Sequence, residues 1–233
     1  MSVSWIQRRH GRNDARGGRA CHEMKTEIIK AKNSTACRRA VDVLVSGGLV
    51  AFPTDTVYGL GASPWDEDAV QRLYQVKERS RGLPIPLLLS DRDELGRVGI
   101  LPESCQALPR RFWPGGLTLV VRKTDAVSAT VSNRPTVAVR IPDHSLARRL
   151  IRQAGGVLAV TSANISGKAS PRTAHDVEAQ LAGRIPIILD GGPSRVGVAS
   201  TIVDCSVSPP RLLRRGAVDE TELRAALGAL DAA

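Results

Sequence analysis

The chain has 233 residues, of which 42% are hydrophobic and 24% charged, a composition typical of a soluble globular protein with one sizeable core. Aromatic residues make up 3%, which argues against an aromatic platform for stacking nucleic-acid bases. No apolar run reaches the roughly 18 residues that a membrane-spanning helix needs. The four cysteines contain no CxxC pair, so their spacing indicates neither a zinc site nor a disulfide framework.

The net charge is +10, which favours anionic partners such as nucleotide phosphates or RNA. Residues 1–23 contribute +3 of this charge, because five arginines there outnumber Asp14 and Glu23. This arginine- and glycine-rich segment has no apolar periodicity, so we predict a basic, disordered tail outside the fold. It also lacks the apolar core of a secretory signal, and we expect a cytoplasmic protein. The alternatives for this segment are an upstream mis-started segment ahead of Met24, a transit peptide and an RNA-binding arm.

Helical and strand patterns alternate from residue 33 onward, which predicts a single α/β domain. Asn33 or Ser34 can cap a first helix, and Gly47 and Gly48 end it. Asp66 can cap a second helix. The apolar positions of the two helices, spaced three and four apart, are Cys37, Ala40, Val41, Leu44 and Val45 in the first and Ala69, Val70, Leu73 and Tyr74 in the second.

The rest of the chain continues this alternation without an internal repeat, and the order of the strands in the sheet cannot be read from it. A further helix is expected to start at Asp143, and His144 and His175 are expected on the surface. Strands are predicted at 48–52, 86–89, 117–121, 136–141, 157–160, 185–189, 200–203 and 211–213, and helices at 103–112, 173–181 and 219–227.

The predicted strand at 48–52 is followed directly by an unusually polar segment. Pro53 lacks the N–H that would continue the ladder, and the residues at 54–56 then supply two hydroxyls and one carboxylate. Gly59 and Gly61 follow, and we expect them to form a turn that lets the backbone approach a ligand closely. Polar groups at the end of a strand beside such a turn suit a small-molecule site. The alternative is an ordinary polar loop whose glycines serve the turn alone.

Several other positions have side chains suited to binding an anionic substrate. Lys77 and Arg79 follow the second helix, and in an extended segment they would project to one side as a phosphate clamp. The alternative is a solvated helix end. Ser162 and Asn164 follow a buried strand and can contact phosphate or amine groups, or else cap a turn. Arg140 ends a strand and can bind a carboxylate in bidentate fashion, or else form an ordinary surface ion pair.

These segments together resemble the YrdC-like domain family, which makes threonylcarbamoyl-AMP for the N6-threonylcarbamoyladenosine modification of transfer RNA. The similarity covers residues 32–227 and implies a single YrdC-like catalytic domain with a twisted, mixed, open sheet, helices on both faces and a central cavity. The segments that carry it, in the family's order and at similar spacing, are Pro53-Thr-Asp-Thr-Val-Tyr-Gly-Leu-Gly61, Lys77-Glu-Arg79, Thr136-Val-Ala-Val-Arg140, Ser162-Ala-Asn164, Ser200-Thr201 and Leu213-Arg214.

The resemblance also implies an activity and a set of site residues. The activity is the condensation of L-threonine, bicarbonate or CO2, and ATP to threonylcarbamoyl-AMP and pyrophosphate, with Mg²⁺ accompanying ATP. Positioning and charge neutralisation would carry such a displacement, which fits the lack of a nucleophile–base pair in the sequence. The implied residues are Thr56, Arg140, Ser162 and Ser200 for threonine, Lys77, Arg79, Thr136, Asn164, Arg172 and Arg214 for ATP, and Lys77, Arg79, Ser162 and Asn164 for catalysis.

The chain also departs from the family pattern. Ser80, Leu83 and Leu88 stand where many relatives have Pro, Asn and His, so those contacts are not assigned here. Arg172 stands where threonine is frequent. The implied partners are transfer RNA or double-stranded RNA and a downstream threonylcarbamoyl-transferase complex. The alternative functions are carbamoyl transfer from carbamoyl phosphate and a non-catalytic RNA-binding module.

Overall fold

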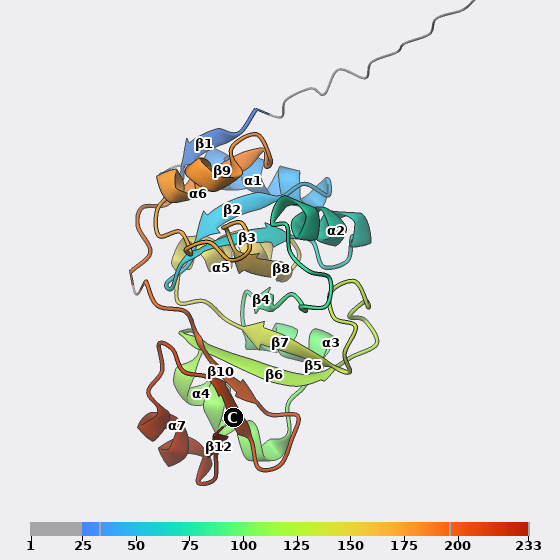
Figure 1. Cartoon of the computed structure of the whole chain (residues 1–233), viewed down its shortest axis with the longest axis vertical. Coiled ribbons are helices and arrows are strands. Elements are labelled where there is room, and N and C mark those ends of the chain that lie inside the picture. The colour runs from blue at the N-terminus through green and yellow to red at the C-terminus, as the bar shows by residue number, and fades with distance from the viewer. Residues whose placement is uncertain (1–24, 33, 196, 233) are drawn as a thin grey trace, which may run out of the picture.

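The computed structural model describes residues 25–32, 34–195 and 197–232, so the predicted tail at 1–23 lies outside the described residues. Within them the chain forms one mixed sheet that is open at both ends, in the order β1-β9-β2-β3-β8-β4-β7-β6-β10-β11-β12, with β5 paired to β6 (Figure 1). The strands are β1 (Glu27–Lys30), β2 (Val50–Pro53), β3 (Tyr58–Ala62), β4 (Leu87–Leu89), β5 (Gly99–Ile100), β6 (Leu117–Lys123), β7 (Thr136–Arg140), β8 (Val157–Ser162), β9 (Ile187–Asp190), β10 (Thr201–Asp204), β11 (Arg211–Arg214) and β12 (Asp231–Ala232).

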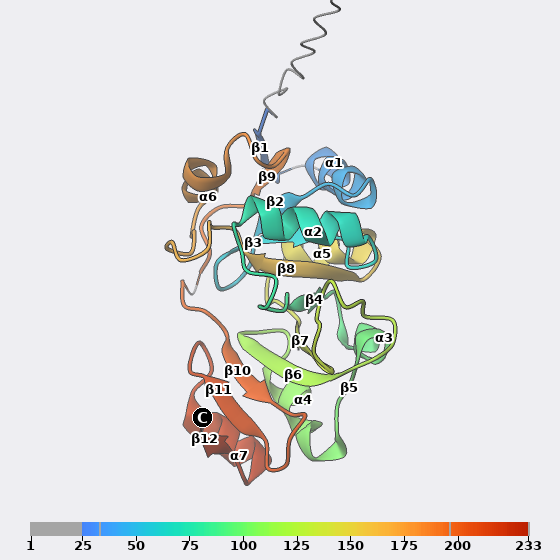
Figure 2. The same cartoon turned by 45° about the vertical axis from the view of Figure 1, so that its right-hand side comes forward.

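Helices lie on both faces of this sheet, and the view in Figure 2 shows α2 in front of the strands with α1 and α5 behind. The α-helices are α1 (Ser34–Val45), α2 (Glu67–Val76), α3 (Leu95–Val98), α4 (Ala107–Phe112), α5 (Ser145–Gln153), α6 (Ala174–Leu181) and α7 (Glu220–Leu227), with two 3-10 turns, η1 (Arg92–Glu94) and η2 (Glu103–Cys105). In the part of the chain that the structure describes, no helix has the length and hydrophobicity to cross a membrane. The predicted mixed, open α/β sheet with helices on both faces is confirmed.

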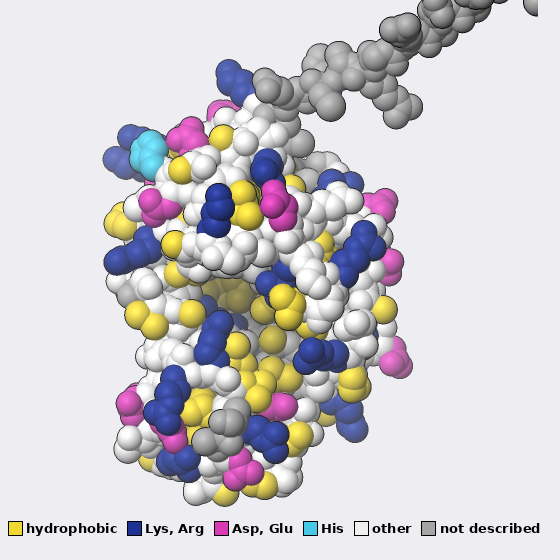
Figure 3. Space-filling view, in the orientation of Figure 1, with side chains coloured by type: hydrophobic (Ala, Val, Ile, Leu, Met, Phe, Trp, Pro, Cys, Tyr) yellow, Lys and Arg dark blue, Asp and Glu magenta, His cyan; other side chains and the backbone are white. Residues whose placement is uncertain are grey.

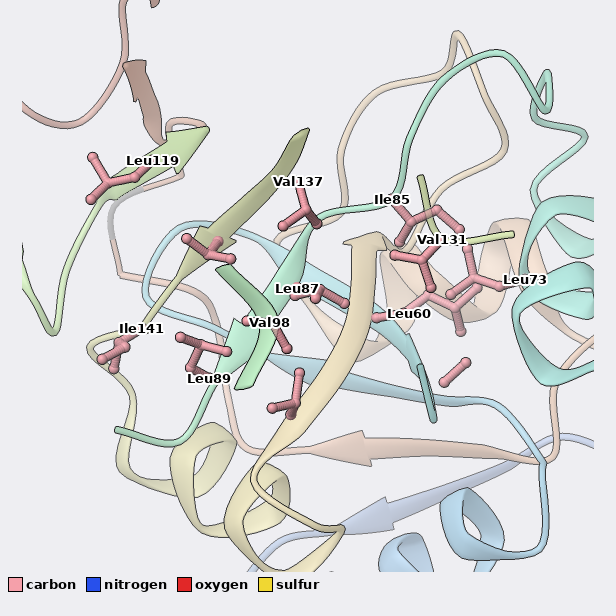
Figure 4. Packing of buried hydrophobic residues seen from close by; sticks show 14 of the residues in the cluster. Leu60, Leu73, Ile85, Leu87, Leu89, Val98, Leu119, Val131, Val137 and Ile141 are labelled. Atoms are coloured by element: carbon pink, nitrogen blue, oxygen red, sulfur yellow. The ribbon is translucent and has the colours of Figure 1, made fainter. Parts of the chain in front are cut away.

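Alternation along the central strands divides the core into two layers. On β8, Val157 and Ala159 pack into the larger core, whereas Leu158 and Val160 pack into the smaller one beneath α1 and α5. Side chains that point alternately to opposite faces of a strand account for this division. Figure 4 shows part of the larger core, where Leu73 of α2 lies near Leu60 of β3. The central strands of the sheet, such as β2, β3 and β4, are therefore buried on both faces, which explains their apolar sequences.

The cap predicted for α2 is confirmed, and the start predicted for α5 is wrong. Asn33, one of the two caps predicted for α1, lies outside the described residues, and α1 begins at the other, Ser34. Asp66 Oδ1 accepts a hydrogen bond of 2.9 Å from the Ala69 amide at the start of α2, as expected. The first turn of α5, however, is capped by His144 and not by Asp143, since His144 Nδ1 accepts from the Ala147 amide. His144 is therefore half-buried, contrary to the prediction of a surface residue, and burial lowers the pKa of its imidazole. His175 is exposed as predicted.

The predicted apolar face of α1 is correct at Cys37, Ala40 and Leu44, which are buried in the smaller core. The prediction that Val45 is buried is wrong, because 70% of this residue is exposed. Ala36, which was not predicted, is buried. Val45 is the last residue of α1 and one position past Leu44, so it points about 100° away from the packed face.

The glycines at 59 and 61 are not turn residues, in contrast to the prediction. β2 and β3 form an antiparallel hairpin in which Pro53 pairs with Tyr58, so both glycines lie inside β3. Thr54 organises the connecting loop, because its Oγ1 donates to the Val57 carbonyl at 2.6 Å and accepts from the Thr56 amide. The glycines are needed for packing, since a Cβ on Gly59 would lie 2.7 Å from Val160 Cγ1.

Substituting Gly59 with alanine should therefore destabilise the protein by about 1–3 kcal/mol, because the new methyl group overpacks against a stiff, buried valine. Urea unfolding of the full chain measures this change. Gly96→Ala is the matched control, because a Cβ there meets nothing within 4 Å, and it should be neutral or slightly stabilising. Equal stability of the two variants would show that Val160 moves aside without cost.

Candidate functional site

A buried guanidinium stands at the end of β7, where it meets the β2–β3 hairpin loop. Arg140 NH2 donates to Asp55 Oδ1 at 2.6 Å, NH1 donates to Thr56 Oγ1 at 2.9 Å, and Nε donates to the Gly115 carbonyl at 2.8 Å. Both members of the ion pair are at most 7% exposed in their side chains. We call Asp55, Thr56 and Arg140 the Arg140 cluster. This buried, oriented pair differs from the surface ion pair considered as the alternative.

A second group of polar side chains is held where β10 begins beside β6. Ser200 Oγ and Thr118 Oγ1 are 2.7 Å apart, and Arg214 NH2 donates to the Ser200 carbonyl at 2.8 Å and to its hydroxyl at 3.2 Å. The Thr201 amide donates to the Gly116 carbonyl, next to the Gly115 carbonyl that holds Arg140. Burial lowers the pKa of Arg140, Asp55 opposes this shift, and the nearby positive charge of Arg214 reinforces it. The positive charges of Arg140 and Arg214 therefore lie close enough to repel each other.

The extended backbone predicted for Lys77 and the alternative of a solvated helix end are both wrong. Lys77 is the C-terminal cap of α2, and the chain then turns sharply at Glu78, whose φ is 52°. The ammonium points inward, is 1% exposed, and donates to the backbone carbonyls of Ser162 and Asn164. Burial lowers the pKa of Lys77 to about 8, and the neighbouring charge of Arg79 contributes less. Lys77 therefore fixes the backbone on which Ser162 and Asn164 stand.

Asn164 combines local turn contacts with a buried acceptor that lacks a partner. Its Nδ2 donates to the carbonyls of Ile165 and Lys168 at 2.9 and 2.8 Å. The alternative of a helix cap or Asx-turn is wrong, because both require the side-chain oxygen to accept from a backbone amide. The Oδ1 of Asn164 is buried, and within the described residues no group donates to it. An unpaired buried oxygen is costly, so this atom is a natural acceptor for a ligand N–H or O–H.

Arg79, Arg172 and Thr136 occupy more peripheral positions. Arg79 is half-buried and donates to the carbonyls of Leu83 and Pro84 at 3.3 and 3.1 Å. The Arg172 guanidinium packs against Gly197, whose amide donates to the Thr56 carbonyl. Thr136 begins the strand that Arg140 ends, so it lies about 13 Å from Arg140 by strand geometry.

The structure thus brings the predicted residues together in two neighbouring groups. Ser162 joins them, because it pairs with Gly59 of the hairpin while its carbonyl receives Lys77. Figure 3 shows this molecule's surface hollowed across the middle, with lysine and arginine side chains near the rim and hydrophobic side chains inside. A separate cavity of about 720 Å³ is lined by residues such as His144, Asp190 and Gly192, and none of the predicted site residues lines it.

Sequence reasoning missed three polar residues that organise the site. Asp55 stood inside the quoted motif without a role, although a carboxylate between two hydroxyls was its signal. Thr118 was detectable as the hydroxyl in an otherwise apolar strand. Tyr58 is buried and donates to the Gly192 carbonyl at 2.7 Å, and burial raises the pKa of its phenol. Nothing in the local sequence predicts that long-range contact.

The comparisons with known proteins agree with this fold. Residues 42–216 match the family model Sua5_yciO_yrdC, described as telomere recombination. The chain therefore belongs to the Sua5/YciO/YrdC family, which confirms the predicted resemblance.

Among its relatives, the threonylcarbamoyl-AMP synthase of Bacillus subtilis is 43% identical over 199 residues, covering 84% of this chain and 58% of that protein. The threonylcarbamoyl-AMP synthase of Vibrio vulnificus is 36% identical over 183 residues, covering 77% of this chain and 97% of that protein. A crystal structure of P. abyssi Sua5 complexed with L-threonine has a TM-score of 0.86 and 39% identity, covering 89% of this chain and 62% of that one. The chain thus spans less than two thirds of two of these relatives.

Proposed function

We propose that this chain is an L-threonylcarbamoyladenylate synthase, which condenses L-threonine, bicarbonate or CO2, and ATP to threonylcarbamoyl-AMP and pyrophosphate. The observation that carries the proposal is the Arg140 cluster, a buried guanidinium with a hydroxyl beside it. The synthase names of the relatives and the threonine bound in the P. abyssi structure support the same conclusion.

The Arg140 cluster suits the amino-acid end of such a substrate. A guanidinium has five N–H donors, and three protein acceptors engage Arg140, so two donors are left for a carboxylate. Thr56 and Ser200 supply hydroxyls for the ammonium and side-chain hydroxyl of threonine, and Ser162 lies on the neighbouring strand. After the amine captures CO2, a carbamate oxygen attacks the α-phosphate and pyrophosphate leaves, with no protein nucleophile required.

The Lys77 region suits the nucleotide end. Lys77 uses two of its three N–H donors on carbonyls, which leaves one for a phosphate oxygen. Arg79 and Arg214 add positive charge, the orphan Oδ1 of Asn164 can accept from the nucleotide, and Thr136 and Arg172 are assigned to ATP on the resemblance. The positive charges of Lys77, Arg79 and Arg214 would stabilise the negative charge on the phosphoryl oxygens.

Mg²⁺ stays a prediction that follows from the chemistry of ATP, whose phosphate oxygens carry the ion. In residues 25–32, 34–195 and 197–232, no three His, Cys, Asp or Glu side chains lie together in a metal-binding arrangement. Asp55, the carboxylate of the Arg140 cluster, is engaged by Arg140. The described residues therefore do not form a dedicated Mg²⁺ site.

The direct test is mass spectrometry of the products formed by the purified chain from ATP, L-threonine and bicarbonate. We expect threonylcarbamoyl-AMP and pyrophosphate, formed only when all three substrates are present. Formation of carbamoyl-AMP from ATP and carbamoyl phosphate, without threonine or bicarbonate, would favour the carbamoyl-transfer alternative. RNA binding without ATP consumption would favour the non-catalytic RNA module. Transfer RNA, the downstream transferase complex and a cytoplasmic location stay predictions.

The polar pocket also predicts the order of amino-acid affinities. Threonine should bind best, serine less well because it lacks the methyl contact, and valine poorly because the hydroxyl-binding groups are left unpaired. Isothermal titration calorimetry with each amino acid, with and without ATP, measures this order. Valine binding as tightly as threonine would contradict the pocket.

Arg79→Ala should weaken ATP binding about tenfold or more and leave threonine binding largely unchanged, since a charge-assisted hydrogen bond contributes roughly 1.5–3 kcal/mol. Arg81→Ala is the matched control, because Arg81 is an exposed arginine in the same segment. Equal ATP affinity of the two variants would show that Arg79 serves the 83–84 backbone alone.

A further inference from the structure

Two cysteines far apart in the sequence are brought into contact along one edge of β6. β7 pairs with the opposite edge, through Val120 and Arg122 of β6. β10 and β5 therefore follow one another along the same edge, with Asp204 opposite Val120 and Ile100 opposite Arg122. Cys105 ends η2, shortly after β5, and Cys205 directly follows β10, where its amide donates to the Val120 carbonyl at 2.8 Å. The two thiols share a hydrogen bond in the larger core.

Cys105 and Cys205 are buried, but a cavity reaches one of them. Cys105 is 0% exposed and Cys205 is 2% exposed, yet Cys205 lines a cavity of about 310 Å³ together with Ser104 and Arg122. A cavity of this size admits a molecule as small as water or hydrogen peroxide, because one water needs roughly 10–15 Å³.

The shared hydrogen bond shifts the pKa values of the two thiols in opposite directions. The Cys205 S–H group stabilises a negative charge on Cys105, which lowers the pKa of the Cys105 thiol to about 7, while burial and this donor role raise the pKa of Cys205. The lowered pKa favours the thiolate of Cys105, which is the form that reacts. Cys205 keeps its proton beside it.

We propose that Cys105 and Cys205 form a peroxide-reactive dithiol that closes to an intrachain disulfide. The Cys105 thiolate attacks one peroxide oxygen, the O–O bond breaks, and hydroxide leaves with Cys105 as sulfenic acid. Cys205 sulfur then attacks the Cys105 sulfur, and the S–O bond breaks. The proton of Cys205 and the departing hydroxide leave as water. The two thiols lose two electrons, and peroxide is reduced to two waters.

The spacing of the cysteines in the sequence gave no reason to expect this bond, because the fold alone creates the contact. Cys37 provides an internal comparison, since it is buried in the smaller core and its thiol lies 3.3 Å from Gln153 Oε1. A buried thiol with an amide neighbour has no resolving partner in the described residues and should stay reduced.

The experiment treats the reduced full chain with hydrogen peroxide, unfolds it in the presence of iodoacetamide, and maps its peptides by mass spectrometry. We expect a linked pair of peptides containing Cys105 and Cys205, a loss of two hydrogens from the intact mass, and full alkylation of Cys37. Dithiothreitol should restore both thiols. Alkylation of Cys105 and Cys205 as complete as that of Cys37 would overturn the proposal, as would a dominant link to Cys21 or Cys37.

Two variants sharpen this test. Cys205→Ser should remove the linked peptides and leave a sulfenic acid on Cys105 that dimedone traps, whereas Cys37→Ser should form the disulfide as readily as the unmodified chain. The mapping of the unmodified chain stands by itself if Cys205→Ser does not fold. Dimedone labelling of the unmodified chain at Cys37 in preference to Cys105 would also contradict the proposed order of steps.

Discussion

Replacing Arg140 with alanine should abolish the binding of threonine, serine and valine and lower the free energy of unfolding by about 3–5 kcal/mol. The loss of binding is expected because the proposed carboxylate contact disappears. The loss of stability has a separate cause. Asp55 is 3% exposed, and the substitution leaves its carboxylate buried without the guanidinium that neutralises it. Calorimetry and urea unfolding measure the two effects.

A double variant separates these two effects. Asp55→Asn combined with Arg140→Met removes both charges and keeps similar volumes, so it should recover much of the lost stability, as replacement of buried ion pairs often does. It should not recover amino-acid binding. Threonine bound normally by either variant would show that Arg140 has a purely structural role. Equal stability of Arg140→Ala and the unmodified chain would show that water reaches Asp55.

Lys77→Met should abolish measurable ATP binding, and it should also change how stability depends on pH. The ammonium donates to two carbonyls beside Ser162 and Asn164, so its loss frees the backbone of the proposed nucleotide end. Lys123→Met is the control, because Lys123 also donates to two carbonyls but lies elsewhere in the fold. ATP binding that survives Lys77→Met would contradict the assignment.

The pH effect follows from the lowered pKa of Lys77. Its ordinary value of 10.5 applies to the unfolded chain, and burial holds it at about 8 in the folded protein. Between these values the unfolded chain binds more protons, so the contribution of Lys77 to stability rises with pH. The unmodified chain should therefore gain about 2 kcal/mol relative to Lys77→Met between about pH 7 and pH 9.5. The difference between the two proteins cancels other titrating groups. A flat difference would mean that the ammonium stays charged throughout.

Local signals in the sequence predicted most of the regular structure. Asp66 and the apolar face of α2 were correct, because a cap and a helical period depend on neighbouring residues. The packing role of Gly59 was missed, because a glycine in a strand and a glycine in a turn look alike until the partner strand is known. The prediction for Val45 was wrong for a related reason. The helical period alone does not show which residues at the end of a helix pack against the sheet.

The sequence predicted many residues of the candidate site, but it predicted few of the contacts between them. Arg140 and Thr56 were named, and they do form a direct hydrogen bond. The inward turn of Lys77 was not foreseen, because it depends on the carbonyls of residues about 85 positions away in the chain. Asp55, Thr118 and Tyr58 have partners on other strands or loops, and no local pattern specifies such partners.

The three protein contacts of Arg140 have a consequence for the kinetics of binding. A long side chain usually loses rotamer freedom when it grips a ligand, at a cost of about 0.5–1.5 kcal/mol. Asp55, Thr56 and the Gly115 carbonyl already hold this guanidinium in one orientation, so folding and not substrate capture bears that entropic cost. An amino acid can then bind without a rearrangement of the Arg140 side chain. Differences in affinity among amino acids should accordingly arise in their dissociation rates more than in their rates of association.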